Sequence, residues 1–142
     1  MKSSESKYCQ CLYFATNSLA RKVEKMAIES WKPVSLSPSH AYLLMMAIEE
    51  PGLQPGNLAD HLQLTPSTIT RLIEKLEEKK LLVRITEGKI ANVYPTSKAK
   101  KLLPQLEKCR QHFYETFNNI LSKKERNEIL ANIYSIESKL AN

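Results

Sequence analysis

The stretch LTPSTITRLIEKLEEKKLL, residues 64–82, decides the fold. Thr65 is a favourable N-cap residue and Pro66 suits the first position of a helix, so the stretch predicts a helix that starts at residue 66. The apolar residues that recur at helical spacing predict one buried face: Ile69, Leu72, Ile73 and Leu76. The opposite face carries small hydroxyl residues, one arginine and then lysines and glutamates. Such a face suits either a solvated surface or a helix that enters a groove.

The segments on either side of this helix predict a helix-turn-helix followed by a hairpin. Gln54-Pro55-Gly56-Asn57 is expected to open a short helix that runs through Leu62, and Gln63-Leu64 is the turn that joins it to the helix from residue 66. The β-rich runs LLVRIT and KIANVYP flank Glu87-Gly88 and predict a hairpin with a short tip. A hairpin directly behind such a helix pair is a wing, which makes the second helix the recognition helix.

The complete chain predicts a mostly helical fold of six helices with a small β-wing. We expect a first helix over residues 5–30, a loop over 30–36 and a buried helix that Ser37 caps. After the wing, Ser97 caps a helix over 98–120, inside which Pro104 produces a kink, and Ser122 with Glu125 forms a capping box for the last helix.

These helices are expected to form one structural domain with three regions. Residues 1–35 form an N-terminal dimerisation helix and loop, residues 36–97 a winged helix-turn-helix lobe, and residues 98–142 the C-terminal dimerisation helices. The terminal helices carry more apolar residues than one small core needs. We therefore expect them to pair with a second copy in an intertwined homodimer.

The positive charge of the chain is concentrated in one region. The net charge is +6, and residues 65–101 hold nine basic and four acidic side chains. Residues 1–64 hold six of each sign, and the C-terminal part is nearly balanced. Such concentration is typical of a polyanion-binding surface, although a solvated charged face has the same composition.

Several classes of protein are disfavoured by the sequence. No segment has the apolar length of a transmembrane helix, and the polar N-terminus does not fit a signal peptide. Three cysteines make no disulfide framework. We therefore expect a cytoplasmic protein with no membrane partner. Because the sequence holds no Ser/His/acid order, phosphate loop or strong metal motif, we expect neither an enzyme nor a cofactor.

The ordered set of these motifs resembles the MarR family of winged-helix transcription regulators. The strongest part is residues 36–84, LSPSHAYLLMMAIEEPGLQPGNLADHLQLTPSTITRLIEKLEEKKLLVR, and VYPTSKAK follows as the exit of the wing. The resemblance implies a homodimeric repressor that binds double-stranded DNA at a pseudo-palindromic operator. Its recognition helices would enter successive major grooves, and its wings would reach the flanking minor grooves. The alternative is a winged helix used only for protein–protein contact.

The residues expected to contact DNA lie on the recognition helix and the wing. Short hydroxyl side chains allow close approach, and Arg71 is the best candidate for reading guanine. Lysines further along the helix and at the exit of the wing, among them Lys98 and Lys100, suit phosphates. In the wing tip Lys89 takes the place of the family's arginine, which predicts a weaker minor-groove contact. The full set is Pro66, Ser67, Thr68, Thr70, Arg71, Lys75, Lys79, Arg84 and Lys89.

A small-molecule effector is a first hypothesis for what the protein senses. The resemblance implies a site for a phenolic or lipophilic ligand between the dimerisation helices and the DNA-binding lobe. The aromatic and methionine residues in or near that region are Trp31, Tyr42, Met45 and Met46. At helical spacing, the same residue types equally suit an ordinary core.

Thiol oxidation is a second hypothesis. CQCLYFA resembles the first-helix segment of the family's branch that senses organic hydroperoxides, in which a reactive cysteine precedes a tyrosine by four residues. Cys9 and Tyr13 have this spacing, and on a helix the phenol would reach the sulfur. Cys11 or Cys109 would resolve a sulfenic acid. That branch's further tyrosines correspond here to Val23 and Pro38. The alternative is therefore that the two cysteines of CQCLYFA are only small apolar residues on a dimer face.

A metal site has the weakest support, and we predict none. Cys109 and His112 share one face of their helix, and His40 begins the second helix. Some members of the family sense zinc with histidines from these helices, but a Cys/His pair at this spacing is a minimal signal. His61 is expected to be a surface residue.

Overall fold

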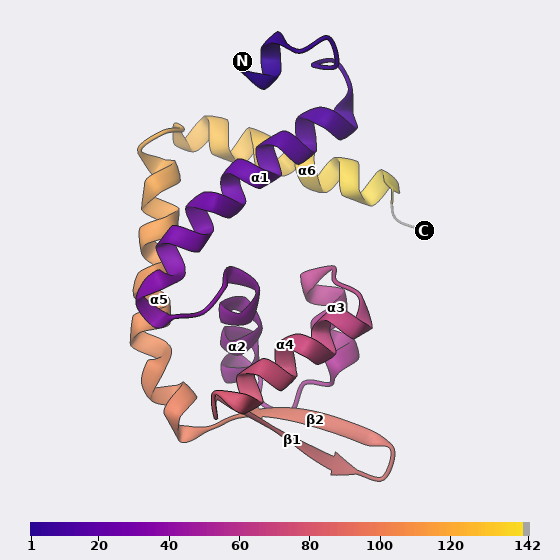
Figure 1. Ribbon diagram of the computed structural model, residues 1–142, viewed down its shortest axis with the longest axis vertical. Coiled ribbons are helices and arrows are strands. Elements are labelled where there is room, and N and C mark those ends of the chain that lie inside the picture. Colours follow the sequence, from indigo (N-terminus) through magenta and orange to yellow (C-terminus); the bar gives the residue numbers. More distant parts are fainter. Residues whose placement is uncertain (141–142) are drawn as a thin grey trace.

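A computed structural model describes residues 1–140 of the chain, and it has the expected architecture of six α-helices and a two-stranded sheet (Figure 1). Two short 3-10 helices, η1 and η2, flank the first α-helix. Within residues 1–140, no helix has the length and apolar character needed to cross a membrane. The elements in chain order are η1 Ser3–Glu5, α1 Leu12–Trp31, η2 Lys32–Val34, α2 Pro38–Glu49, α3 Pro55–Leu62, α4 Pro66–Glu78, β1 Leu82–Glu87, β2 Ile90–Pro95, α5 Ser97–Asn118 and α6 Lys123–Leu140.

The core lies where α2 is surrounded by α1, α3, α4, α5 and the sheet. The body of α2 is apolar on nearly every side, and Leu43, Leu44 and Ala47 are fully buried. Ser37 caps this helix as predicted, because its side chain accepts a hydrogen bond from the His40 amide. Trp31 at the end of α1 closes the core, with its ring 5.4 Å from that of Tyr42 in an edge-to-face arrangement.

The wing is an antiparallel hairpin that packs at one end on the core. Its register pairs Arg84 with Val93, and Val93 also bridges Leu53 in the connection between α2 and α3. Gly88 at the tip has φ of 65°, a conformation that glycine adopts without strain. The predicted hairpin around Glu87-Gly88 is therefore confirmed, and its base is fixed while its tip extends beyond the helices (Figure 1).

The N-terminal segment differs from the prediction of a helix over residues 5–30. The helix begins at Leu12, and Cys11 has extended backbone angles. Two local hydrogen bonds compete with helix formation before it: the Glu5 carboxylate accepts from the Lys2 amide, and the Ser6 hydroxyl accepts from the Tyr8 amide. The helix also continues through Trp31, and the short helix η2 follows at once over Lys32–Val34, so only residues 35–36 of the predicted loop over 30–36 lie outside a helix.

The start of α5 also differs from the prediction. Its N-cap is Thr96 rather than Ser97, because the Thr96 hydroxyl accepts from the Ala99 amide at 3.2 Å. The same hydroxyl donates to the Lys80 carbonyl at 2.8 Å, so this cap also ties α5 to the end of α4. The predicted capping box of α6 is confirmed by reciprocal 3.1 Å bonds between Ser122 and Glu125.

Candidate nucleic-acid interface

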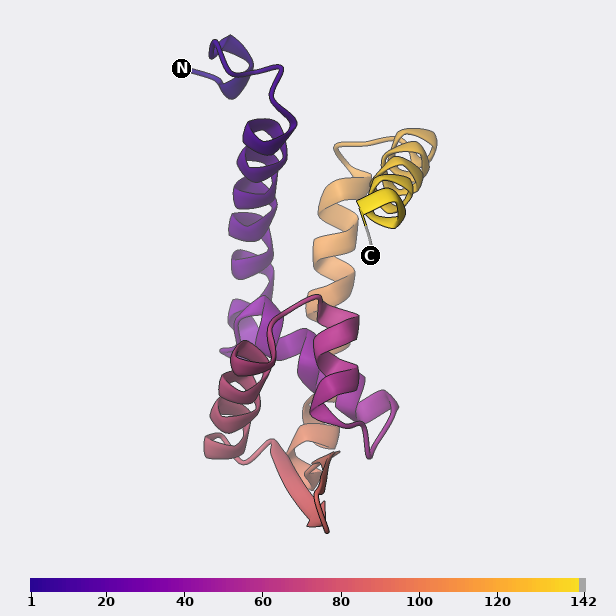
Figure 2. The same cartoon turned by 90° about the vertical axis from the view of Figure 1, so that its right-hand side faces the viewer.

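The recognition helix α4 is held by its buried stripe and capped at the position that the sequence predicts. Ile69, Ile73 and Leu76 are fully buried, and Leu72 nearly so. The Thr65 side chain accepts from the Thr68 amide at 3.3 Å and contacts the Thr68 hydroxyl at 2.9 Å. The opposite face of α4 is therefore turned to solvent. The helix itself lies above the wing in Figures 1 and 2.

The first two turns of α4 present short polar side chains and one guanidinium group. Ser67, Thr70 and Arg71 are exposed, whereas Thr68 is half-buried beneath the cap. The Thr70 hydroxyl donates to the Pro66 carbonyl at 3.0 Å, which leaves its methyl group and its acceptor lone pairs for an external contact. No ion pair within residues 1–140 includes Arg71. Of the predicted cations on α4, Arg71 is thus the one most available to a ligand.

The cations further along α4 are engaged to different degrees. Lys75 lies 3.6 Å from the Glu78 carboxylate, and both side chains are exposed, so solvent weakens this pair. Lys79 Nζ donates to the Ser35 carbonyl at 3.4 Å, and Lys98 Nζ donates to the Lys79 carbonyl at 2.9 Å. These two contacts join the end of α4 to the turn before α2 and to the start of α5.

The wing contributes one engaged arginine and one exposed lysine. Arg84 Nη2 lies 2.8 Å from Glu77 Oε1, so its guanidinium group already has a carboxylate partner. Lys89 at the tip is exposed, as are Ile85 and Ile90 on the strands. Sequence reasoning missed the role of Glu77 because the pair joins two elements, and no local pattern signals it.

His40, proposed from the sequence only as a weak metal candidate, lies instead beside the lysines of α4. Partial burial, and then the positive charges of Lys79 and Lys75, lower the pKa of His40 below its ordinary value. Ser37 Oγ contacts its Nδ1. No local sequence pattern indicates this placement, because it depends on the packing of α4 beside the start of α2. The contact between Lys79 and Ser35 there joins residues that are 44 apart in the sequence.

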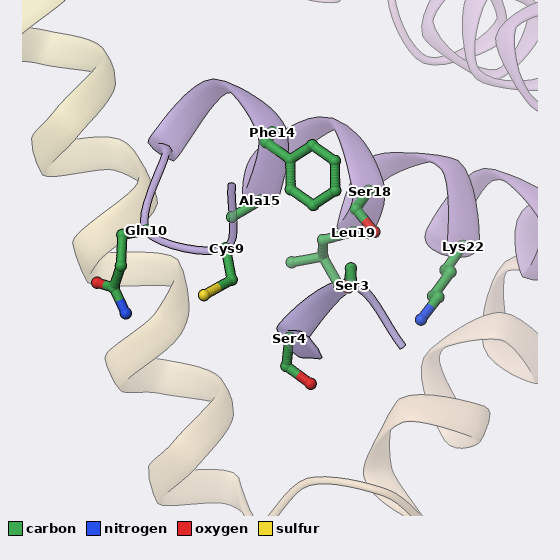
Figure 3. Close-up of a pocket in the computed structure, with 9 residues that line it drawn as sticks. All are labelled: Ser3, Ser4, Cys9, Gln10, Phe14, Ala15, Ser18, Leu19 and Lys22. Carbon is green, nitrogen blue, oxygen red and sulfur yellow. The ribbon is translucent and has the colours of Figure 1, made fainter. Parts of the chain in front are cut away.

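Cys9 does not have the helical relation to Tyr13 that the sequence predicts. Cys9 and Cys11 precede α1, so a helical turn does not connect Cys9 with Tyr13, and the Tyr13 side chain is largely exposed. Cys9 instead faces a cavity of about 360 Å³ between η1 and α1 (Figure 3). This cavity is lined by Ser3, Ser4, Cys9, Gln10, Phe14, Ala15, Ser18, Leu19 and Lys22.

Cys109, the other predicted partner in thiol chemistry, is buried on α5. Burial raises the pKa of its thiol, which disfavours the thiolate. Together with His112 it borders a second cavity of about 440 Å³ between the end of α1 and α5, which Glu29, Ser30, Pro33, Gln105 and Lys108 complete. Within residues 1–140, no three metal-ligating side chains converge, and His40 is not among the residues around this cavity.

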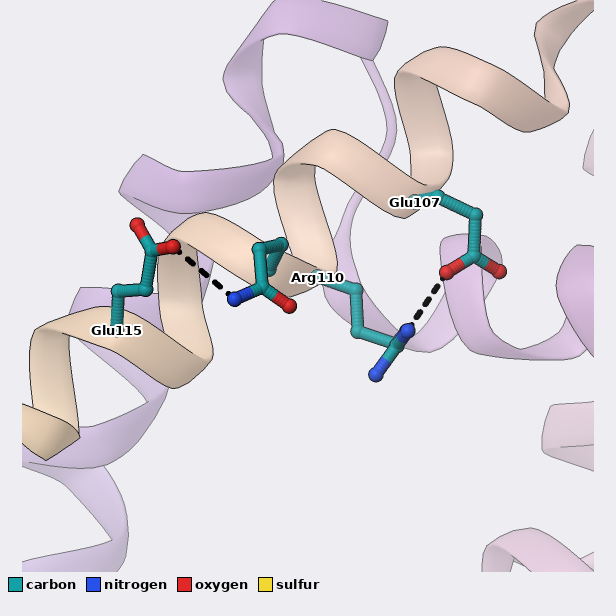
Figure 4. Close-up of polar contacts among 4 residues, drawn as sticks. Glu107, Arg110 and Glu115 are labelled. Carbon is teal, nitrogen blue, oxygen red and sulfur yellow. Dashed lines mark hydrogen bonds and ion pairs between the residues drawn. The ribbon is translucent and has the colours of Figure 1, made fainter.

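The residues predicted to line an effector site are divided between core and surface. Trp31 and Met45 are buried in the core, and Tyr42 and Met46 are half-buried. Burial raises the pKa of the Tyr42 hydroxyl, and the nearby Arg110 opposes this shift. Arg110 is held on α5 by Glu107, whose carboxylate accepts two of its hydrogen bonds, and Gln111 donates to Glu115 one turn further (Figure 4).

Comparisons with known proteins agree with this architecture. The sequence model of the MarR family matches residues 34–89. The chain is 24% identical to the uncharacterized HTH-type transcriptional regulator YybA of Bacillus subtilis (strain 168) over 125 residues, 86% of this chain and 83% of YybA.

Solved structures extend the similarity to nearly the whole fold. The transcriptional repressor CouR bound to p-coumaroyl-CoA has a TM-score of 0.84 at 19% identity, covering 96% of this chain and 98% of CouR. The S. aureus MepR–DNA complex has a TM-score of 0.78 at 21% identity, covering 90% of this chain and 97% of MepR. Residues 34–89 therefore match the sequence model of the MarR family, and the chain as a whole has the fold of these solved regulators.

Proposed function

We propose that this protein is a sequence-specific regulator that binds double-stranded DNA as a homodimer and represses transcription from a pseudo-palindromic operator. The observation that carries the proposal is the orientation of α4. Its four apolar residues are buried, so the exposed Arg71 and the hydroxyl groups beside it project together from the molecule. A protein-docking helix would instead expose apolar side chains there, which disfavours the alternative of a protein–protein module.

The homodimer is supported by apolar side chains that the single chain leaves uncovered. No residue of α6 is buried, although the helix has an apolar face. The exposed fraction is about 40% for each residue of that face: Ile129, Leu130, Ile133 and Ile136. On α1, Leu12 and Leu19 are also exposed. α6 and the N-terminal half of α1 lie at the end of the molecule opposite the wing (Figures 1 and 2). A second copy packed against this end would cover them and leave both recognition helices free.

Selection of duplexes from a random-sequence pool by the wild-type protein tests the proposal. We expect enrichment of a site with two half-sites about one helical turn apart, roughly 10 bp. Arg71→Ala should weaken binding to that site by about 1–3 kcal/mol and relax selectivity at one base in each half-site. Arg110→Ala, which removes the same charge from α5, is the matched control. A pool without enriched sequences, or equal binding by the Arg71 and Arg110 variants, would contradict the proposal.

A small-molecule effector is supported by one structural neighbour, the repressor CouR, which is solved with p-coumaroyl-CoA and also with a 23-mer DNA duplex. For this chain we propose that a ligand between the dimerisation helices and the DNA-binding lobe lowers DNA affinity. The half-buried Tyr42 and Met46 are the candidates to contact it. Release of the selected duplex by a compound, with weaker release from Tyr42→Ala, would support this. Compounds that release both variants equally act elsewhere.

Thiol oxidation remains a separate proposal, based on Cys9 and its cavity rather than on the predicted pair with Tyr13. Peroxide would oxidise the Cys9 thiol to a sulfenic acid, and the nearby exposed Cys11 would condense with it to a disulfide and release water. We expect peroxide to release DNA from the wild-type protein but not from Cys9→Ser. The control is Cys109→Ser, because the buried Cys109 should leave the response unchanged.

A further inference from the structure

The start of α2 and the end of α4 meet in a group of cationic side chains that are distant in the sequence. His40 lies on the first turn of α2, Lys75 and Lys79 at the end of α4, and Lys98 at the start of α5. The 3.4 Å bond from Lys79 Nζ to the Ser35 carbonyl and the 2.9 Å bond from Lys98 Nζ to the Lys79 carbonyl hold these elements together. We call His40, Lys75, Lys79 and Lys98 the junction cluster.

The positive charge of the junction cluster is not balanced by nearby acids. Within residues 1–140, no ion pair includes His40, Lys79 or Lys98, and Lys75 has only its exposed contact with Glu78. The charged groups that act on His40 are Lys79 and Lys75 of α4. The other elements packed against α2, which are α1, α3, α5 and the wing, contribute no charge that shifts it within the described chain. An anion is therefore the complementary ligand.

The imidazole of His40 is arranged so that it can exist in either protonation state. Its Nδ1 contacts Ser37 Oγ, which can donate to the neutral ring or accept from the protonated one. Because Nδ1 is engaged, Nε2 is the nitrogen left for an external acceptor. It carries a proton in the imidazolium and in the neutral tautomer in which Ser37 Oγ donates to Nδ1. Partial burial, and then the neighbouring lysines, favour the neutral ring in the free protein.

The position of the junction cluster along α4 matches the geometry of a DNA groove. Arg71, Lys75 and Lys79 are four residues apart and so lie on one face of the helix. Eight residues of helix separate Arg71 from Lys79, a rise of about 12 Å. The major groove is about 12 Å wide. When Arg71 lies within the groove, Lys79 and its neighbours are thus at the level of the sugar–phosphate backbone that borders it.

We infer that the junction cluster binds a phosphate of the DNA backbone and that His40 takes up a proton when it does so. The inference rests on the proposed function and adds a contact from α2 that sequence reasoning did not assign. The phosphate charge stabilises the imidazolium and opposes the two lysines. Since bound protein holds more protons than free protein, DNA affinity rises as the pH falls.

The test compares wild-type protein with His40→Gln and with the matched control His112→Gln, which changes an exposed histidine of α5. The probes are the duplex selected by the wild-type protein and a scrambled duplex of equal length, measured by fluorescence anisotropy between about pH 8 and about pH 6. Wild type and His112→Gln should gain about threefold to tenfold in affinity on acidification. His40→Gln should lose this gain on both duplexes, because a phosphate contact is independent of sequence.

A direct measurement on the unmodified protein accompanies these variants. The pKa of His40, followed by NMR of the histidine ring, should rise when the selected duplex is added. Lys79→Gln should reduce the slope of log affinity against log salt by about one relative to Lys108→Gln. This variant also tests the site if His40→Gln fails to fold.

The outcomes separate the inference from the proposed function. A wild-type protein that selects no duplex at any pH would refute the proposed function. Duplex selection with an unchanged His40 pKa, or a wild-type pH response in folded His40→Gln, would overturn the phosphate contact at the junction cluster alone. The same holds if Lys79→Gln and Lys108→Gln have equal salt slopes.

Discussion

Arg84 on β1 and Glu77 on α4 form the ion pair that ties the wing to the recognition helix. Arg84 Nη2 lies 2.8 Å from Glu77 Oε1, and about one third of each side chain is exposed. The other ion pairs within residues 1–140 join residues three apart in the sequence. A phosphate bound by Arg84 would therefore compete with Glu77 for the same guanidinium group.

This competition predicts that neutralising Glu77 strengthens DNA binding. Glu77→Gln should raise affinity for the selected duplex at low salt by about threefold, because it frees Arg84 and removes one negative charge near the backbone. Glu107→Gln, which removes an equivalent partner from Arg110 on α5, is the control and should change affinity little. Weaker binding by Glu77→Gln would show that the ion pair positions the wing for DNA binding and that Glu77 does not compete with phosphate for Arg84.

The two adjacent residues at the start of α5 should differ in their effect on stability. Thr96→Ala should lower the free energy of unfolding by about 1–2 kcal/mol, because it removes the cap to Ala99 and the bond to the Lys80 carbonyl. Ser97→Ala should change it by less than about 0.5 kcal/mol. Thr96→Ser keeps the hydroxyl and should recover most of the loss. Urea denaturation of the three variants measures the free energy of unfolding. Equal losses from Thr96→Ala and Ser97→Ala would contradict the assignment of Thr96 as the N-cap.

Burial of the α4 stripe predicts a large difference between two isoleucines. Ile73 is fully buried, so Ile73→Ala should cost about 2–5 kcal/mol of unfolding free energy through lost contacts and the cavity left behind. Ile85 on the wing is 47% exposed, and Ile85→Ala should cost less than about 0.5 kcal/mol. Denaturation of both variants is measured at one fixed protein concentration, so that any contribution of subunit association to the unfolding free energy is compared at the same concentration.

The exposed apolar face of α6 predicts that a charge placed on it separates the subunits. Ile133→Glu should convert a dimer into monomers in sedimentation or light scattering, because a carboxylate cannot be buried there without a partner. The same change at the similarly exposed Ile85 should leave the dimer intact. A wild-type protein that is monomeric at every concentration, or dimers in both variants, would argue against this interface.

The lowered pKa of His40 predicts a loss of stability in mild acid. The folded protein disfavours the imidazolium relative to the unfolded chain, so the contribution is fully present above the ordinary pKa of about 6.5 and is lost as the pH falls through the lower folded value. His40→Gln should therefore lose less stability than wild type between about pH 7 and about pH 5. Thermal unfolding without DNA measures this, and parallel profiles would show that another group controls the acid response.

Some features of the fold could be predicted because they depend on residues within a turn of one another. The Ser37 and Thr65 caps, the buried stripe of α4 and the hairpin at Gly88 are all encoded by local spacing and backbone preference. The errors have equally local causes. The Glu5 and Ser6 side chains bind backbone amides before α1, and this competition shortens the predicted first helix.

The sequence by itself therefore determined the order of the elements, the buried face of the recognition helix and the concentration of charge around it. Only the tertiary structure decided which of those charges are free. It pairs Arg84 with Glu77, leaves Arg71 exposed, and brings Lys79 to Ser35 and His40. The physical reason is that capping and periodicity act between neighbours in the chain, whereas contacts between cations and their partners depend on how separate helices and strands pack.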